Sequence, residues 1–112
     1  MRVSLAQLKR WAKADEYGST ALHLAARLGE PANIAALLKA GAEIEAHDKH
    51  GGTALHDAAW VGAPANIAAL LGAGASGSVR NQYGKTPFDY AKFNDKVSGT
   101  YAHWALKDAK YK

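Results

Sequence analysis

Cysteine is absent from the 112-residue chain, which excludes a disulfide framework and any thiolate metal site. No apolar run approaches the length that spans a membrane, so we expect no membrane partner. Valine, isoleucine and phenylalanine do not gather into runs, which argues against a sheet protein. The apolar residues are rich in alanine, which suits thin helices that approach one another closely. These absences together favour a single all-α domain.

The formal net charge is +4 and the isoelectric point is near 9.4. Such a charge favours acidic partners or simply aids solubility, and a solvated lysine tail at the C-terminus explains part of it. On charge alone we do not expect nucleic acid as the partner. We expect a cytoplasmic monomer, although the absence of cysteine fits either redox compartment and a removed signal peptide would leave no trace.

The chain repeats itself at an offset of 33 residues without a gap. Residues 15–47 read DEYGSTALHLAARLGEPANIAALLKAGAEIEAH, and residues 48–80 read DKHGGTALHDAAWVGAPANIAALLGAGASGSVR. A third copy begins at Asn81 as NQYGKTPFDYA and then diverges. A fixed period in this range indicates a solenoid, in which each unit buries its apolar face against its neighbours.

Each copy predicts two helices and a connector. A threonine hydroxyl caps the first helix, an i, i+3, i+4 stripe of leucine and alanine follows, and a glycine ends it. We expect that glycine to take the left-handed backbone conformation, which glycine adopts without steric cost. A proline then starts the second helix, which another glycine ends. In the order cap, first glycine, proline, second glycine, the positions are Thr20, Gly29, Pro31 and Gly41, repeated as Thr53, Gly62, Pro64 and Gly74; the third copy has Thr86 and Pro87, with Asp89 completing a capping box.

The residues before the first copy predict an N-terminal capping helix. Ser4 is a candidate N-cap with Gln7 three residues later. Leu5, Leu8 and Trp11 lie on one helical face, which we expect to cover the first repeat.

A second capping helix is predicted after the third copy diverges. We expect Thr100 to cap a helix from Tyr101 onward, with Trp104 and Leu106 packed against the preceding repeat. Such a helix hides the last apolar face from water.

The runs GSTALHLAARLG, GGTALHDAAWVG and GKTPFDYA closely resemble the ankyrin repeat, and the resemblance covers Asp15 to about Phe93. It implies one ankyrin-repeat solenoid over 1–112, divided into a capping helix (1–14), repeat 1 (15–47), repeat 2 (48–80) and a divergent repeat 3 with its C-terminal cap (81–112). Two departures stand out. Alanine replaces the usual proline after Thr20 and Thr53, and Gly77 replaces the apolar anchor that Ile44 offers, which predicts a loose connector there.

Histidines are the residues that most suggest chemistry, but their pattern favours structure. The resemblance implies that His23 and His56 hydrogen-bond the threonine three residues earlier and the neighbouring connector, rather than a metal. His47 and His50 lack the further ligands that a structural zinc site needs. No nucleophile triad, phosphate loop or acidic pair is evident. We therefore expect no enzyme, no catalytic residue, no cofactor and no metal.

The resemblance implies that connector tips and the exposed side of each first helix form a groove for a protein partner. Trp60 is the leading candidate, because repeat 1 has Arg27 at the same position and the fold does not demand an aromatic there. The alternative, that Trp60 and Phe93 only pack on their own solenoid, stays open. The candidate groove residues are Tyr17, Arg27, Lys49, His50, Trp60, Tyr83, Lys85 and Phe93.

Asp57 breaks the repeat in a second way, because Leu24 and Tyr90 occupy its position in the other copies. The carboxylate either meets a basic neighbour, Arg27 or Lys85, or faces the groove.

The sequence thus predicts a non-enzymatic protein–protein interaction module whose basic, aromatic groove favours a partner with carboxylates and an apolar knob. One alternative is a nucleic-acid binder that uses Lys49, Arg80 and Lys85 on phosphate. The other is an inhibitor or immunity-type protein that blocks one enzyme.

Overall fold

The computed structural model describes residues 4–14, 16 and 18–111, which form seven helices and no strand. The predicted all-α solenoid is confirmed. The helices are α1 (Leu5–Ala14), α2 (Ala21–Leu28), α3 (Pro31–Lys39), α4 (Ala54–Val61), α5 (Pro64–Gly72), α6 (Pro87–Ala91) and α7 (Tyr101–Ala109).

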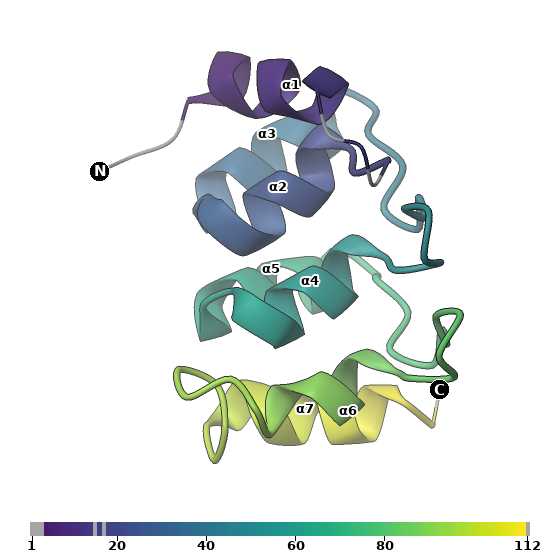
Figure 1. Ribbon diagram of the computed structural model, residues 1–112. Coiled ribbons are helices and arrows are strands. Elements are labelled where there is room, and N and C mark those ends of the chain that lie inside the picture. Colours follow the sequence, from purple (N-terminus) through teal and green to yellow (C-terminus); the bar gives the residue numbers. More distant parts are fainter. Residues whose placement is uncertain (1–3, 15, 17, 112) are drawn as a thin grey trace.

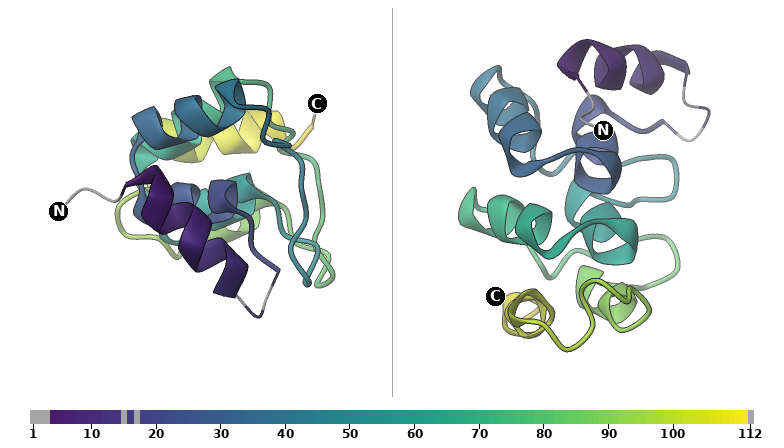
Figure 2. Two further views of the ribbon diagram at one scale, coloured as in Figure 1. Left: turned by 90° about the horizontal axis from the view of Figure 1, so that it is seen from above. Right: turned by 90° about the vertical axis from the view of Figure 1, so that its left-hand side faces the viewer.

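The helices stack as antiparallel pairs in two columns (Figures 1 and 2). One column holds the first helix of each pair, with α4 packed on α2 and α6 packed on α4. The other holds the second helices, with α5 packed on α3 and α7 packed on α5. The connectors between the pairs project together to one side of the stack, and α1 lies across α2 at the N-terminal end (Figure 1).

Small residues let the first helices approach closely. The stripe of α2 (Leu22, Ala25 and Ala26) and its copy in α4 (Leu55, Ala58 and Ala59) are buried, as the repeat pattern predicts. Of the second helices, α3 and α5 bury an isoleucine and a leucine each. The core is therefore a thin, continuous layer between neighbouring repeats rather than one globular centre.

Histidines tie each repeat to the next connector, as the resemblance implies. The backbone N–H of Thr20 donates to Nδ1 of His23 at 3.1 Å, so this nitrogen is an acceptor and the ring proton lies on Nε2. Nε2 donates to the carbonyl of Gly52 at 2.8 Å. His56 makes the same bonds one repeat later, with Thr53 and with the carbonyl of Lys85. These bonds fix the connectors relative to α2 and α4.

The two glycines that end the first helices do so for a reason other than the predicted one. Gly29 has φ −94° and Gly62 has φ −84°, so neither is left-handed. A Cβ at Gly62 would lie 2.4 Å from the carbonyl oxygen of Ala26 and 2.8 Å from Cα of Ala58. Glycine is required here because two backbones approach closely, not because of a special φ.

Asparagine side chains join neighbouring repeats on the other side of the stack. Nδ2 of Asn66 donates to the carbonyls of Ala26 and Gly29 at 3.2 and 3.1 Å. Nδ2 of Asn94 donates to the equivalent carbonyls of repeat 2, Ala59 and Gly62. Asn94 does not occupy the position of Asn66 within its repeat, so the divergent third copy keeps this bond pair from a different place in the sequence.

The N-terminal cap largely follows the prediction. Ser4 and Gln7 form the reciprocal capping pair, with N–H···O distances of 2.9 and 3.1 Å. Leu8 is fully buried, whereas Trp11 remains 41 % exposed.

The C-terminal cap differs from the prediction at two residues. Leu106 is fully buried, but Trp104 is exposed and stacks on the ring of His103 instead of packing on the solenoid. The hydroxyl of Thr100 does not cap α7, because it donates to the carbonyl of Val97. Ala102 takes the inward position predicted for Trp104, since it lies four residues before Leu106 on the same face.

α7 lies against the connector predicted to be loose, and its looseness stays a prediction. A Cβ at Gly77 would lie 2.5 Å from Cβ of Ala109, and Gly77 itself is buried. The glycine that replaces Ile44 thus makes room for the C-terminal helix, and a hollow of about 510 Å³ remains between this connector and α7.

Candidate protein-binding groove

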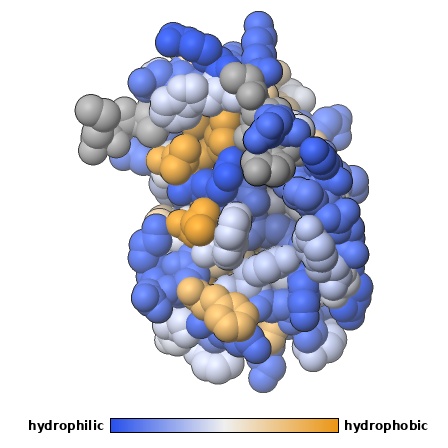
Figure 3. Space-filling model, in the orientation of Figure 1, coloured by the Kyte–Doolittle hydropathy of each residue, from blue (hydrophilic) through white to orange (hydrophobic). Residues whose placement is uncertain are grey.

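The groove face is the exposed side of α2, α4 and α6 together with the tips of the connectors. Apolar groups emerge there near the ends of these helices, among hydrophilic neighbours (Figure 3). The exposed apolar residues lie in the last turns of α2 and α4 and just after α6. They are Leu28, Trp60, Val61 and Phe93. Exposed apolar residues that recur in successive repeats are the kind of feature that marks interaction sites.

Trp60 lies at the centre of this face. Its side chain is 53 % exposed, and it lines three adjoining pockets. The first pocket lies toward Arg27 of repeat 1, the second toward Tyr83, and the third toward Phe93. The helix that carries Trp60, α4, packs against α2 on one side and α6 on the other.

Most of the predicted groove residues meet around Trp60. Arg27 and His50 share the first pocket with it, His50 and Tyr83 share the second, and Lys85 and Phe93 share the third. Lys49 is exposed at its connector tip and lines none of these pockets among the described residues. Tyr17 lies outside the described residues.

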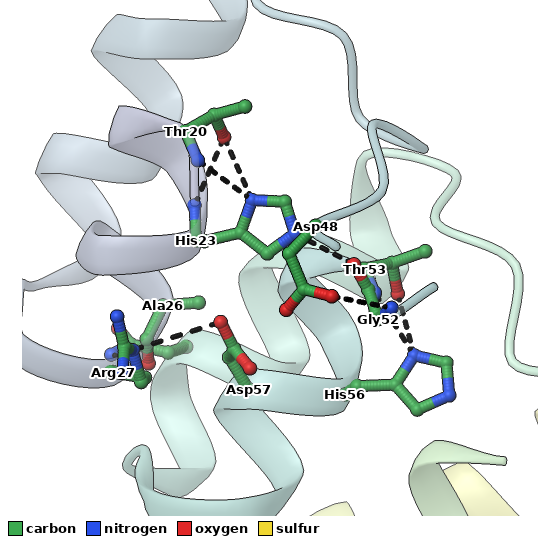
Figure 4. Close-up of polar contacts among 10 residues, drawn as sticks. Thr20, His23, Ala26, Arg27, Asp48, Gly52, Thr53, His56 and Asp57 are labelled. Carbon is green, nitrogen blue, oxygen red and sulfur yellow. Dashed lines mark hydrogen bonds and ion pairs between the residues drawn. The ribbon is translucent and has the colours of Figure 1, made fainter. Parts of the chain in front are cut away.

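The structure resolves the alternatives for Asp57. Its Oδ2 lies 3.7 Å from Nε of Arg27, an ion pair between neighbouring repeats (Figure 4). The same carboxylate also borders the groove, because Asp57 lines both the first and the second pocket. The position is 9 % exposed.

Asp48 and Tyr90 belong to the groove although sequence reasoning did not select them. Asp48 lines the first and second pockets, and Tyr90 lines the second and third. Oδ1 of Asp48 accepts the backbone N–H groups of His50 and Gly52, both at 2.9 Å, and so shapes the connector turn. The difference between Asp48 and Asn81 at equivalent repeat positions was the available signal.

A possible metal cluster occurs among the described residues, where ligand atoms of His23, Asp48 and Asp57 all lie within 4.8 Å of one another. The hydrogen bonds of His23 argue against metal binding, because they use both nitrogens of the ring. Its Nδ1 accepts from Thr20, and its Nε2 carries the proton donated to Gly52, so a metal would have to break one of these bonds. The carboxylates of Asp48 and Asp57 face each other beside this ring (Figure 4).

Two titratable groups around the groove have shifted pKa values. Burial lowers the pKa of His56 below 6.5, against the raising effect of its hydrogen bond to the Lys85 carbonyl. Burial alone would raise the pKa of Asp89, but the backbone and hydroxyl hydrogen bonds from Thr86 outweigh it, so the pKa is lowered. Both groups are thus held in the protonation state that completes a helix cap at neutral pH.

The model of the family described as ankyrin repeats (3 copies) matches residues 4–81. The chain belongs to the ankyrin-repeat family. The match includes α1 and ends before α6, and the packing of α6 on α4 and of α7 on α5 continues the ankyrin arrangement beyond it. A search of curated proteins finds no match.

Membership gives the general role of this ankyrin-repeat protein. Ankyrin repeats generally serve as protein–protein interaction modules, and the family is typically non-enzymatic. Within the described residues, no helix combines the length and the apolar content that crossing a bilayer requires.

Proposed function

We propose that this protein is a non-enzymatic interaction module that binds a protein partner across the groove face, with Trp60 as the central anchor. The observation that carries the proposal is the position of Trp60, half exposed and shared by three adjoining pockets. A tryptophan buries a large area on binding with few rotors to immobilise. Exposed apolar area of this kind has a cost in a free monomer, which partner binding relieves.

The surroundings of Trp60 support binding rather than packing. The equivalent residues, Arg27 and Phe93, are an arginine and a second exposed aromatic, so the scaffold accepts any of three unlike side chains there. The bonds that tie α2 and α4 to the connectors come from other positions, His23 and His56. The position of Trp60 is therefore separable from the histidines that tie the helices to the connectors.

A nucleic-acid partner is less consistent with the groove. Lys85 and Lys92 line the pocket that also contains Phe93, but Asp89 lies between them and lines it too. Asp48 and Asp57 border the other two pockets. Carboxylates at these places repel phosphate, which dominates the affinity of proteins for nucleic acid.

The test compares two tryptophans of equal exposure. Trp104 is also 53 % exposed but lies on α7 and lines none of the three pockets. Wild-type protein, Trp60→Ala and Trp104→Ala are used for affinity capture from native extract, followed by mass spectrometry. We expect a partner that wild type and Trp104→Ala retain and Trp60→Ala loses.

Folding is checked in parallel by circular dichroism and thermal unfolding. If Trp60→Ala unfolds as readily as a core variant, the residue serves packing and the proposal is wrong. Equal retention of the partner by both variants contradicts it as well. A captured nucleic acid with steep salt dependence would favour the alternative class of partner.

A further inference from the structure

The second groove pocket combines aromatic and acidic side chains. It encloses about 280 Å³ between the connector of repeat 2 and that of repeat 3. Trp60, Tyr83 and Tyr90 supply aromatic surface, and Asp48 and Asp57 supply carboxylates. We call this site the acidic aromatic pocket. Its volume is at the lower limit for small-molecule sites and suits a single inserted side chain.

The carboxylates at this pocket are not required by the turn or the helix that carry them. Asn81, the residue equivalent to Asp48 in the next repeat, accepts the corresponding backbone N–H groups, those of Tyr83 and Lys85, through its amide oxygen at 3.0 and 3.1 Å. A neutral amide therefore shapes this turn as well as a carboxylate does. Asp57 has Leu24 and Tyr90 as its equivalents, so its helix position also accepts neutral residues.

The described residues that line the pocket carry negative charge. Carboxylate oxygens of Asp48 and Asp57 lie within 4.8 Å of each other, and Arg27 offers one guanidinium, from the side of the first pocket. Among the described residues that line the acidic aromatic pocket, none is lysine or arginine. Lys49 and Lys85 are exposed on the connectors beside it, and the neutral His56 ring forms part of its wall. Two carboxylates close together in partly buried surroundings favour a further cation.

We propose that the acidic aromatic pocket receives a basic side chain, lysine or arginine, from the protein partner. The inference rests on the proposed function and names the chemistry of the partner at its central contact. A cation over Trp60 or a tyrosine ring gains the cation–π attraction, and the carboxylates offer charge-assisted hydrogen bonds. The sequence alone predicts an acidic partner from the exposed cations. The pocket instead presents carboxylates, which are opposite in charge to the exposed lysines beside it, so at this contact we infer a basic side chain.

The probe is a single capped amino acid, so the test does not depend on the identity of the partner. N-acetyl-arginine amide and N-acetyl-lysine amide are titrated into the full chain while the indole N–H signals are followed by NMR. Trp11 and Trp104 are internal controls, because neither lines this pocket. We expect the Trp60 signal alone to move, and to saturate. N-acetyl-norleucine amide, which lacks the positive charge, should bind more weakly by at least about fivefold.

Charge-removing variants separate the carboxylates from the aromatic walls. Asp48→Asn copies the residue of the next repeat and keeps the turn, and we expect it to weaken arginine amide binding about threefold. Asp57→Asn should weaken it as well, with unfolding measured in parallel because this variant also loses the ion pair with Arg27. Asp95→Asn removes an equal charge at an exposed site that does not line the pocket and should leave the affinity unchanged.

Several outcomes would overturn the inference. These are equal binding of the norleucine amide, tighter binding of N-acetyl-glutamate amide, wild-type affinity in both aspartate variants, or no saturable shift at Trp60. If arginine amide binds while Trp60→Ala retains the captured partner, the proposed function fails and the pocket chemistry stands. If the partner is lost and arginine amide does not bind, the groove function stands and the basic side chain is wrong.

Discussion

Single residues that repeat at an interval of 33 carry the scaffold, and two of them do so through contacts that only the folded chain shows. Gly29 and Gly62 look in sequence like ordinary helix-ending glycines, yet their backbones are extended. A Cβ would lie too close to a backbone carbonyl, in the adjacent helix turn for Gly29 and in the preceding repeat for Gly62. This lack of space is what selects glycine. Residues that break the repeat, such as Trp60 and Asp57, instead border the groove.

Gly62→Ala is expected to destabilise the protein by about 1–3 kcal/mol, because its Cβ would meet backbone atoms that cannot move independently. Gly72→Ala is the matched control. An added Cβ there meets no atom within 4 Å and the residue ends α5, so we expect a gain of about 0.5–1 kcal/mol. Urea unfolding measures both. Equal stability of the two variants would show that the close approach at Gly62 is not a constraint.

His56 predicts a dependence of stability on pH. Its pKa in the folded state is lowered below 6.5, so the unfolded chain takes up the proton first as the pH falls. The contribution of this group to stability is fully present above pH 6.5 and is lost as the pH falls below it. The loss amounts to at most about 1.4 kcal/mol per pH unit for one proton.

Unfolding free energies from pH 8 to pH 5 measure this effect in wild type and in His56→Gln. We expect a smaller slope below pH 6.5 in the variant, which has no titrating ring at this position. An identical slope in both proteins would assign the acid sensitivity to other groups.

At the scale of elements, the third repeat keeps the packing contacts of repeats 1 and 2 although its sequence has diverged from theirs. α7 packs on α5 as α5 packs on α3, although the 33-residue sequence repeat ends near Phe93. Asn94 replaces the bonds of Asn66 from a different position, and Gly77 makes room for Ala109. Packing and unsatisfied carbonyls thus define the unit more strictly than residue identity does.

Asn94→Ala is expected to cost about 1–3 kcal/mol, because it leaves the buried carbonyls of Ala59 and Gly62 without their side-chain donor. Asp95→Ala, at the exposed neighbouring position, should change stability by no more than about 0.5 kcal/mol. Thermal unfolding of the two variants decides. A loss confined to Asp95→Ala, or no loss in either, would mean that this tie does not join the repeats.

The sequence predicts elements well where copies agree and poorly where a single copy must be judged. The threonine caps and buried stripes of repeats 1 and 2 follow from their repetition, and the histidine bonds follow from the resemblance to ankyrin repeats. Trp104 is wrongly placed inside because α7 has no copy for comparison, and its large apolar ring outweighs the better fit of Ala102. The partner of Asp57 needs the distance to Arg27, which no pattern contains.

At the scale of the whole molecule, the solenoid separates support from recognition. The described part of the structure measures 33 × 27 × 24 Å, and the extensive contacts of each helix pair are with the neighbouring pairs. Support comes from the buried layer and from bonds that cross between repeats. In our proposal, recognition belongs to side chains on one face, where Trp60 lines three pockets and two aspartates lie opposite each other.

The most direct measurement of this central claim is site-specific photo-crosslinking in living cells. The photoreactive residue benzoylphenylalanine is placed at Phe93, 72 % exposed on the groove face, or at Tyr101, 93 % exposed on α7 in the other column of helices. We expect a discrete protein adduct from position 93 and none from position 101. An adduct from position 101 without one from position 93 would contradict the groove as the binding surface.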